Sequence, residues 1–251
     1  MTAALTVSGL QAGYGGKPVL HGVDLSVAQG SALTIVGPNG SGKSTLLKAI
    51  AGQIPAQAGT ITMGDTDLTR MSAQARTRAG LVFVPQERNV FRNMNVMENL
   101  RLGWDFHHHG ATGGLSAKLD EVLQLFPEIK PHLHTAAGFL SGGQRQMVAV
   151  ASAMMLEPSV LVLDEPSAGL SPRNARLLFE IIDRIRQTGL TLLMIEQNVQ
   201  LGLSVAEQGL VLVMGRVRHR APASELAHDT SLAALFLGVS GSHDAPSIDV
   251  S

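Results

Sequence analysis

Two kinds of hydrophobic pattern occur along this chain, and each predicts a different kind of strand. Leu5-Thr6-Val7 and Val23-Asp24-Leu25-Ser26-Val27 alternate strictly, which is typical of strands with one buried face. Continuous apolar runs at Leu81 to Val84 and Val160 to Leu163 instead indicate strands of a parallel sheet that are buried on both faces. Further strands are predicted at 32–36, 61–65, 190–195 and 210–214, the last turning at Met214-Gly215 into Val217.

Helical patterns separate these strands. Short helices are predicted at 46–51 and 72–78, and a longer one begins at Ser171-Pro172 and stops at Gly189. From about residue 89 to residue 156 the chain shows only helical signals. These are an Asn95–Glu98 capping pair, apolar residues at helical spacing from Leu115 to Phe126, and a helix that begins at Ser141. We therefore expect an α/β core with a mainly parallel sheet and a helical insertion.

The amino-acid composition excludes only a few classes of function for this chain. The 251 residues carry a net charge of −1, which gives no electrostatic reason to expect a nucleic-acid partner. Without cysteine, disulfides, thiolate catalysis and zinc–sulfur sites are excluded. No apolar run approaches the roughly 20 residues that cross a bilayer, and the first residues lack the pattern of a signal peptide. We expect a cytoplasmic location.

The most informative stretch is Gly37-Pro38-Asn39-Gly40-Ser41-Gly42-Lys43-Ser44-Thr45, between a predicted strand and a predicted helix. Its G-x-x-x-x-G-K-S spacing is that of the phosphate-binding loop of nucleotide triphosphatases. The glycines let backbone N–H groups converge on a phosphate, and the helix N-terminus adds a partial positive charge. Lys43 can then reach the β- and γ-phosphates, and the Ser44 hydroxyl can ligate Mg²⁺. A glycine-rich turn that only caps a helix is the simpler alternative.

Two carboxylates follow the buried strand at 160–163. Asp164 is suited to hold Mg²⁺, and Glu165 to orient or deprotonate an attacking water. Without the phosphate-binding loop, an acidic turn in solvent would be the preferred explanation of the pair; the loop reverses that preference.

Two further segments extend the pattern. Leu140-Ser141-Gly142-Gly143-Gln144 opens a helix and could form a second anion site, although Ser141 could also be an ordinary N-cap. Gln86 lies between a core strand and the insertion, where its amide could sense the metal and the γ-phosphate.

These pieces together resemble the ATP-binding subunits of ABC transporters, over about residues 5–238. The matching segments are Gly37 to Thr45 (Walker A), Gln86 (Q-loop), Leu140 to Gln144 (signature) and Leu161 to Glu165 (Walker B). Within that family the chain is most similar to the subunits of branched-chain amino acid importers, through Ala12 to Gly15, Gln86 to Phe91, Asp164 to Pro172 and Ile195 to Asn198.

The resemblance implies ATP and Mg²⁺ as cofactors and a P-loop core with an N-terminal antiparallel β portion. Tyr14 would stack on adenine, and Gln197 would occupy the switch position, where ABC ATPases usually have histidine. The implied catalytic residues are Lys43, Glu165 and Gln197, and the implied metal ligands are Ser44, Gln86 and Asp164. The implied nucleotide contacts are Tyr14, Asn39, Gly40, Ser41, Gly42, Lys43, Ser44, Thr45, Gln86, Ser141, Gly142 and Gly143. Ser171 replaces the aspartate that is usual in the loop after Walker B.

The resemblance also implies partners and domain limits. Two ATPase subunits, identical or related, would enclose ATP head to tail on the inner face of the membrane, bound to permease subunits and indirectly to a periplasmic solute-binding protein. The core would comprise 1–88 and 157–220, the helical subdomain 89–156, and a C-terminal segment 221–238, with a mobile tail at 239–251. The alternative is a non-transport ABC ATPase that acts on DNA, ribosomes or cluster assembly; the absence of a basic surface and the fit to importer subunits argue against it.

Two other groups of residues have simpler interpretations. We expect the run His107 to His109 to lie in an exposed loop of the insertion rather than to bind a metal. We expect Arg70, Arg76 and Arg78 to form a solvated face.

Overall fold

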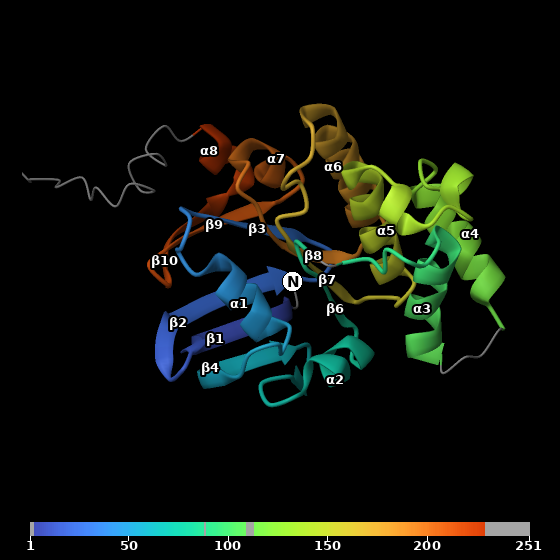
Figure 1. Ribbon diagram of the computed structural model, residues 1–251. Helices are drawn as coiled ribbons and strands as arrows, with labels where there is room; N and C mark the ends of the chain where they lie inside the picture. Colours follow the sequence, from blue (N-terminus) through green and yellow to red (C-terminus); the bar gives the residue numbers. More distant parts are fainter. Residues whose placement is uncertain (1–2, 88, 109–112, 229–251) are drawn as a thin grey trace, which may run out of the picture.

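A computed structural model describes residues 3–87, 89–108 and 113–228 (Figure 1). The strands are β1 (Ala3–Tyr14), β2 (Lys17–Ala28), β3 (Ala32–Val36), β4 (Ala56–Met63), β5 (Thr66–Asp67), β6 (Leu81–Val84), β7 (Val160–Asp164), β8 (Thr191–Ile195), β9 (Gln208–Val213) and β10 (Arg216–Pro222). The α-helices are α1 (Lys43–Ile50), α2 (Ala73–Arg78), α3 (Val96–His108), α4 (Leu115–Leu125), α5 (Gly142–Met154), α6 (Pro172–Gln187), α7 (Val199–Ser204) and α8 (Ala223–His228). Short 3₁₀ turns lie at Lys130–His132 and Ala137–Phe139.

The strands form two sheets. One is antiparallel, in the order β2-β1-β4-β5, and the other has the order β10-β9-β3-β8-β7-β6. In the second sheet the strands from β9 to β6 are parallel, and β10 pairs with β9 in the antiparallel sense. The predicted α/β class, mainly parallel sheet and N-terminal antiparallel portion are thus confirmed.

The helices cover the parallel sheet on both faces. α1 lies between the two sheets, and its Leu46, Leu47 and Ile50 are fully buried in the core that it shares with β1, β2 and β3 (Figure 1). On the other face α5 and α6 pack in a second core, to which α3 and α4 contribute Trp104 and Val122. The insertion is helical as predicted, apart from an isolated bridge between Asn95 and Ala136.

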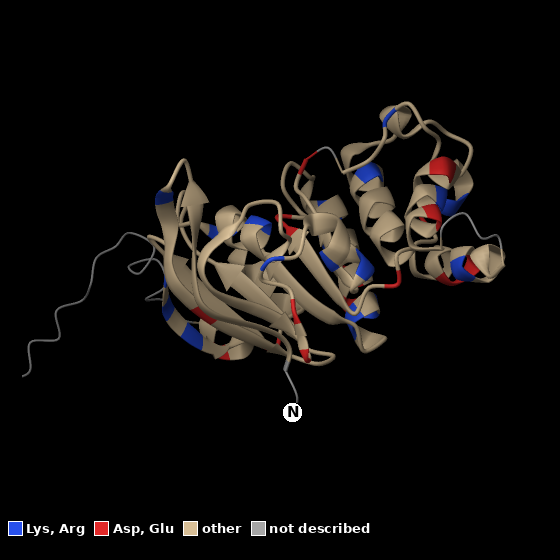
Figure 2. Cartoon of the chain, turned by 90° about the horizontal axis from the view of Figure 1, so that it is seen from below, with Lys and Arg blue, Asp and Glu red and all other residues tan. Residues whose placement is uncertain are grey.

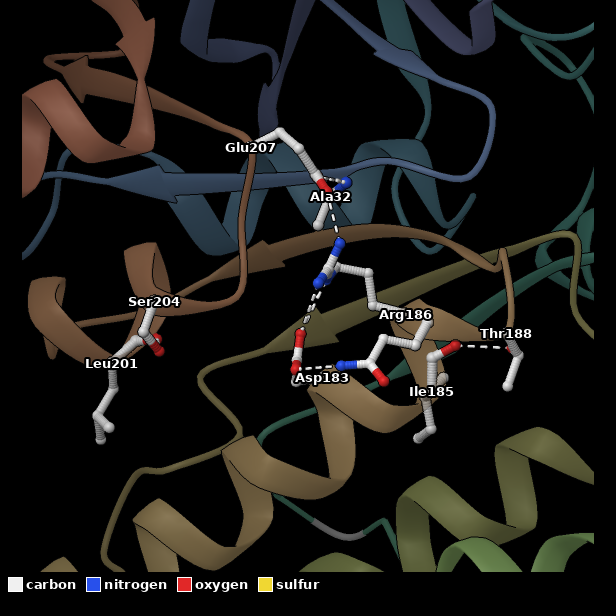
Figure 3. A network of polar contacts seen from close by, with 9 residues as sticks. Ala32, Asp183, Ile185, Arg186, Thr188, Leu201, Ser204 and Glu207 are labelled. Carbon is white, nitrogen blue, oxygen red and sulfur yellow. Dashed lines mark hydrogen bonds and ion pairs between the residues drawn. The ribbon is translucent and has the colours of Figure 1, made fainter.

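The predicted capping signals are present at several helices. Asn95 Oδ1 accepts from the Glu98 N–H at 2.8 Å, and Glu98 Oε2 accepts from the Asn95 N–H at 2.7 Å, so the pair satisfies donors at the start of α3 reciprocally. Ser171 caps α6, with Pro172 as its first residue. Another polar cluster joins the sheet to α6: Glu207 accepts from the Ala32 N–H and pairs with Arg186 at 2.8 Å (Figure 3).

Positively and negatively charged residues are interspersed along the chain in Figure 2. Within the described ranges, no helix combines the length and the apolar character that a membrane span requires.

The segment Gly13 to Gly16 joins the first two strands. β1 continues to Tyr14, and only Gly15 and Gly16 form the turn to β2. Both turn glycines have positive φ angles, of 57° and 77°, as a two-residue hairpin turn requires. The alternation at 5–7 and 23–27 therefore marks only the first part of β1 and the second half of β2, which are 12 residues long each.

The histidine run also differs from the expectation. His107 and His108 belong to the last turn of α3 and are half-buried, rather than lying in a loop. The His108 ring stacks on Trp104 at a centroid distance of 3.6 Å, and its Nε2 lies 3.4 Å from a Glu157 oxygen. The stacking on Trp104 and the proximity of Glu157 show that the end of α3 is packed against neighbouring residues. His109 and the predicted tail 239–251 lie outside the described residues.

Arg76 does not belong to the predicted solvated face, although Arg70 and Arg78 are exposed as expected. Its side chain is only 1% exposed, and its guanidinium donates to the carbonyl oxygens of Ala49 (2.7 Å) and Ile50 (2.6 Å), at the C-terminal end of α1. It also donates to the carbonyl oxygens of Met71 (3.1 Å) and Thr69 (2.9 Å). A cation is favourable at a helix C-terminus, where carbonyls lack partners within the helix. Arg76 therefore holds the far end of the helix that begins at the phosphate-binding loop.

We expect Arg76→Met to destabilise the protein by about 3–5 kcal/mol, because it leaves several buried carbonyl groups without donors. Urea unfolding would measure the loss. Arg70→Met is the matched control: Arg70 is exposed, so its replacement should cost no more than about 0.5 kcal/mol. Equal midpoints for the two variants would contradict the role assigned to Arg76.

Candidate functional site

The site begins with the loop that joins β3 to α1. Gly37 has a φ of 155°, and a Cβ there would lie 2.1 Å from the carbonyl oxygen of Leu212 in β9. Gly42 precedes α1 with a φ of 101°, a left-handed conformation that side chains disfavour. These constraints explain the two glycines in this loop. Ser41 and Gly42 are buried within it, whereas Asn39 and Gly40 are exposed.

Lys43 folds back over this loop. Its Nζ donates to the carbonyl oxygens of Gly37 (2.8 Å) and Pro38 (3.0 Å), and the side chain is 5% exposed. Burial lowers the pKa of the Lys43 ammonium, while the charges of Glu165 and Asp164 oppose that shift. The ammonium thus lies at the centre of the loop, where phosphate oxygens could replace the two carbonyls as partners.

Asp164 ends β7 and is 5% exposed. Burial, reinforced by the charge of Glu165, raises the pKa of its carboxyl to about 6, against the opposing influence of Lys48, Ser44 and Lys43. Among the described residues, nothing hydrogen-bonds to the buried Asp164 Oδ1. A buried carboxylate oxygen that lacks a partner, beside the hydroxyl of Ser44, fits Mg²⁺, which binds hard oxygen ligands.

Glu165 follows directly and adopts an unusual backbone conformation. Its φ of 46° is left-handed, which costs free energy for a residue with a side chain. Its Oε2 accepts a hydrogen bond of 2.7 Å from the Gln197 side-chain amide, and its N–H donates to the Ile195 carbonyl at 3.0 Å. The end of β7 and the loop after β8 are therefore joined at the candidate catalytic carboxylate.

The segment at 140–144 forms the predicted helix start. Ser141 caps α5: its Oγ accepts from the Gln144 N–H at 3.2 Å, and Gln144 Oε1 accepts from the Ser141 N–H at 2.9 Å. The simpler interpretation of Ser141 as an N-cap is thus part of its role. Gly143 is also sterically required, because a Cβ there would lie 2.9–3.0 Å from atoms of Asn174 in α6. Gly142 is exposed at the helix N-terminus, where an anion would be favoured.

Gln86 is exposed just after β6 and lies near the start of α5. It lines a cavity of about 630 Å³ together with Gly142, Ala168 and Gly169. Asn89 Nδ2 donates to Gln146 Oε1 at 2.7 Å, so the same connection is tied to α5.

The structure sorts the predicted residues into two groups. The 37–45 loop, Asp164, Glu165 and Gln197 are linked by hydrogen bonds and by mutual electrostatic effects. Gln86 and Gly142 line a different cavity, which contains no residue of the 37–45 loop. Tyr14, at the end of β1, is 50% exposed. Leu20 of β2, the other strand of this hairpin, lies beside Gly42 of the 37–45 loop.

Sequence reasoning missed Glu196, which lies between β8 and Gln197. It is 1% exposed and accepts backbone hydrogen bonds from three residues of two loops. Its position directly after an apolar run, like that of Asp164 after the run 160–163, was a signal available in the sequence.

Comparison with known proteins agrees with this geometry. Residues 20–168 match the family model described as ABC transporter. A probable branched-chain amino acid transport ATP-binding protein, LivF, of Archaeoglobus fulgidus is 38% identical over 92% of this chain and 97% of its own length. The high-affinity branched-chain amino acid transport ATP-binding protein BraG of Pseudomonas aeruginosa is 37% identical over 88% and 91%.

More distant relatives share the same architecture. The lipopolysaccharide export system ATP-binding protein LptB of Escherichia coli is 32% identical over 94% of this chain and 98% of its own. Among solved structures, the ADP conformation of an ATP-binding cassette of an ABC transporter superposes with a TM-score of 0.83, at 26% identity, over 95% of this chain and 100% of the other. The chain therefore belongs to the ABC transporter family, as one of its ATP-hydrolysing cassettes.

Proposed function

We propose that this cassette energises the import of branched-chain amino acids. One structural observation supports the energy-coupling role above all: the buried pair Asp164–Glu165 is electrostatically coupled to Lys43 of the phosphate-binding loop. The choice of solute rests on the two relatives named for branched-chain amino acid transport, which are more similar to this chain than the lipopolysaccharide export protein is.

In the proposed mechanism the 37–45 loop binds the phosphates of ATP through its backbone N–H groups, and Lys43 pairs with the β- and γ-phosphates. Ser44 and Asp164 would hold Mg²⁺, which would neutralise phosphate charge. Gln86, the third ligand that the resemblance implies, lines the other cavity. Glu165 orients and deprotonates the attacking water. Gln197 holds the Glu165 carboxylate through their 2.7 Å hydrogen bond, and its amide would donate to the γ-phosphate of bound ATP. Tyr14 stacks on the adenine.

The second anion site completes the proposal. Because Ser141, Gly142 and Gly143 begin a helix away from the phosphate-binding loop, they would bind the γ-phosphate held by a partner subunit, either a second copy or a related ATPase. ATP would then stabilise the closed dimer because it contacts both subunits only in that state. Hydrolysis and phosphate release would remove the link.

The permease would dock on a groove between the core and the insertion. This groove, of about 370 Å³, lies beside α2, α3 and α5, and its apolar lining includes Phe83, Phe91, Leu102 and Phe106. Phe91 is 63% exposed, which favours a partner that covers it. Docking there would hold the cassette at the inner face of the membrane, with a periplasmic solute-binding protein as an indirect partner.

We expect Glu165→Gln to reduce ATP hydrolysis by at least about 100-fold, because the amide cannot accept a proton, while ATP binding and an ATP-bound dimer persist. Phosphate release and light scattering with Mg²⁺–ATP would measure the two effects. Glu180→Gln, an exposed carboxylate of α6, is the control and should keep wild-type turnover. Wild-type turnover in Glu165→Gln would contradict the assigned role.

Asp164→Asn should abolish Mg²⁺-dependent hydrolysis and yet stabilise the metal-free protein. The raised pKa means that ionised Asp164 destabilises the fold; a shift from 3.8 to about 6 corresponds to about 3 kcal/mol. This cost is fully present above about pH 6 and disappears below about pH 4, so the gain from Asn should follow the same window. Urea unfolding in EDTA at pH 8 and pH 4 tests it; an equal gain at both values would contradict the proposed titration.

Deletion of the gene should abolish uptake of radiolabelled leucine, isoleucine and valine in the native organism. Re-expressed wild-type protein should restore it, and Glu165→Gln should not. Uptake of an unrelated solute, such as glutamate, controls for general loss of energy. Unchanged leucine, isoleucine and valine uptake in the deletion strain would contradict the proposed solute class.

A further inference from the structure

Glu196 is a buried carboxylate at the centre of the candidate catalytic region. It follows β8 directly, and only 1% of it is exposed. A Cβ at Gly202 of α7 would lie 2.9 Å from the Glu196 Cβ, so the helix packs closely against the base of this side chain. The side chain is thus held in one orientation.

The carboxylate accepts backbone hydrogen bonds from two loops. Its Oε1 accepts from the Ser167 N–H at 2.8 Å, in the loop after β7. Its Oε2 accepts from the N–H groups of Gln197 (3.0 Å) and Asn198 (3.3 Å), in the loop after β8. An ionised carboxylate can accept at both oxygens, which an amide cannot.

These bonds close a ring of contacts around the proposed reaction centre. Ser167 lies two residues after Glu165 on one loop, and Gln197 lies on the other. The Gln197 side chain returns to Glu165 at 2.7 Å. A shift of the Glu196 carboxylate would therefore move both loops and alter the separation of Glu165 and Gln197.

The ring has an energetic cost. Burial raises the pKa of the Glu196 carboxyl, while hydrogen bonds from Ser167, Asn198 and Gln197 oppose that shift. A buried carboxylate requires several donors to remain ionised. Loss of any one of these three hydrogen bonds therefore weakens the fixation of the side chain by the other two.

We infer that Glu196 is a positioning residue that sets the geometry of Glu165 and Gln197 for hydrolysis by tying together the loops after β7 and β8. The inference rests on the roles proposed above for Glu165 and Gln197. Glu196 has no direct contact with the nucleotide in this scheme, so its effect should fall on the chemical step rather than on ATP binding.

The first test is Glu196→Gln, which preserves shape but leaves only one oxygen to accept. We expect kcat to fall about 10-fold or more, since small misplacements of reacting groups are costly, with the Kd for a fluorescent ATP analogue unchanged within about twofold. Glu207→Gln is the matched control, because Glu207 also accepts a backbone N–H, from Ala32, but lies in the cluster beside α6 (Figure 3). Its kcat should remain that of the wild type. A wild-type kcat for Glu196→Gln would overturn the inference.

A double-mutant cycle with Gln197→Ala separates positioning from general stability. If Glu196 acts through Gln197, Glu196→Gln should reduce kcat much less in the Gln197→Ala background than alone. Additive effects would overturn the inference. Wild-type turnover in Glu165→Gln would instead overturn the proposed function, so the two failures are distinguishable.

Amide exchange in the wild-type protein provides a test that needs no variant to fold. NMR should show slow hydrogen exchange at Ser167, Gln197 and Asn198, because each of these N–H groups has a carboxylate acceptor. If the Ser167 amide exchanges as fast as an amide in a solvent-exposed loop, the inference is overturned, regardless of the kcat values of the variants.

Discussion

The parallel register of β3, β8 and β7 is the constraint on which the candidate site depends. Ile35 of β3 is opposite Ile195 of β8, and Ile195 is opposite Asp164 of β7. Parallel strands end at the same edge of a sheet, so the segments that follow these strands meet there. This pairing brings together the 37–45 loop, the Asp164–Glu165 pair and Glu196–Gln197, although the loop is more than a hundred residues away from the other two segments along the chain.

The same edge concentrates charge in a poorly solvated place. Lys43, Asp164 and Glu196 are each at most 5% exposed, and burial is the main cause of the pKa shift of each. Glu196 is stabilised by backbone donors, whereas Asp164 Oδ1 has no partner among the described residues. Glu196 is thus a carboxylate whose partners hold two loops together, whereas Asp164 has an oxygen that can bind a ligand.

Much of the fold and part of the site could be predicted from the sequence. Continuous apolar runs and capping pairs located β6, β7 and α3 correctly, because these features depend on neighbouring residues alone. Local patterns could not show which side chains would form hydrogen bonds with backbone groups that are distant in the sequence. Arg76 was therefore misplaced on the surface, since its acceptors at Ala49 and Ile50 lie in another helix. Glu196 was missed for the same reason: its partner Ser167 is 29 residues away.

The contact at Gly143 has a mechanical consequence. A Cβ there would lie only 2.9–3.0 Å from side-chain atoms of Asn174, so α5 and α6 approach closely, and the two helices also share one core. Closely packed interiors transmit displacement rather than absorb it. α6 begins just after the loop that carries Glu165 and Ser167. A displacement of the insertion should therefore move α5 and α6 together as one rigid body, and it should shift the loop that carries Glu165 and Ser167.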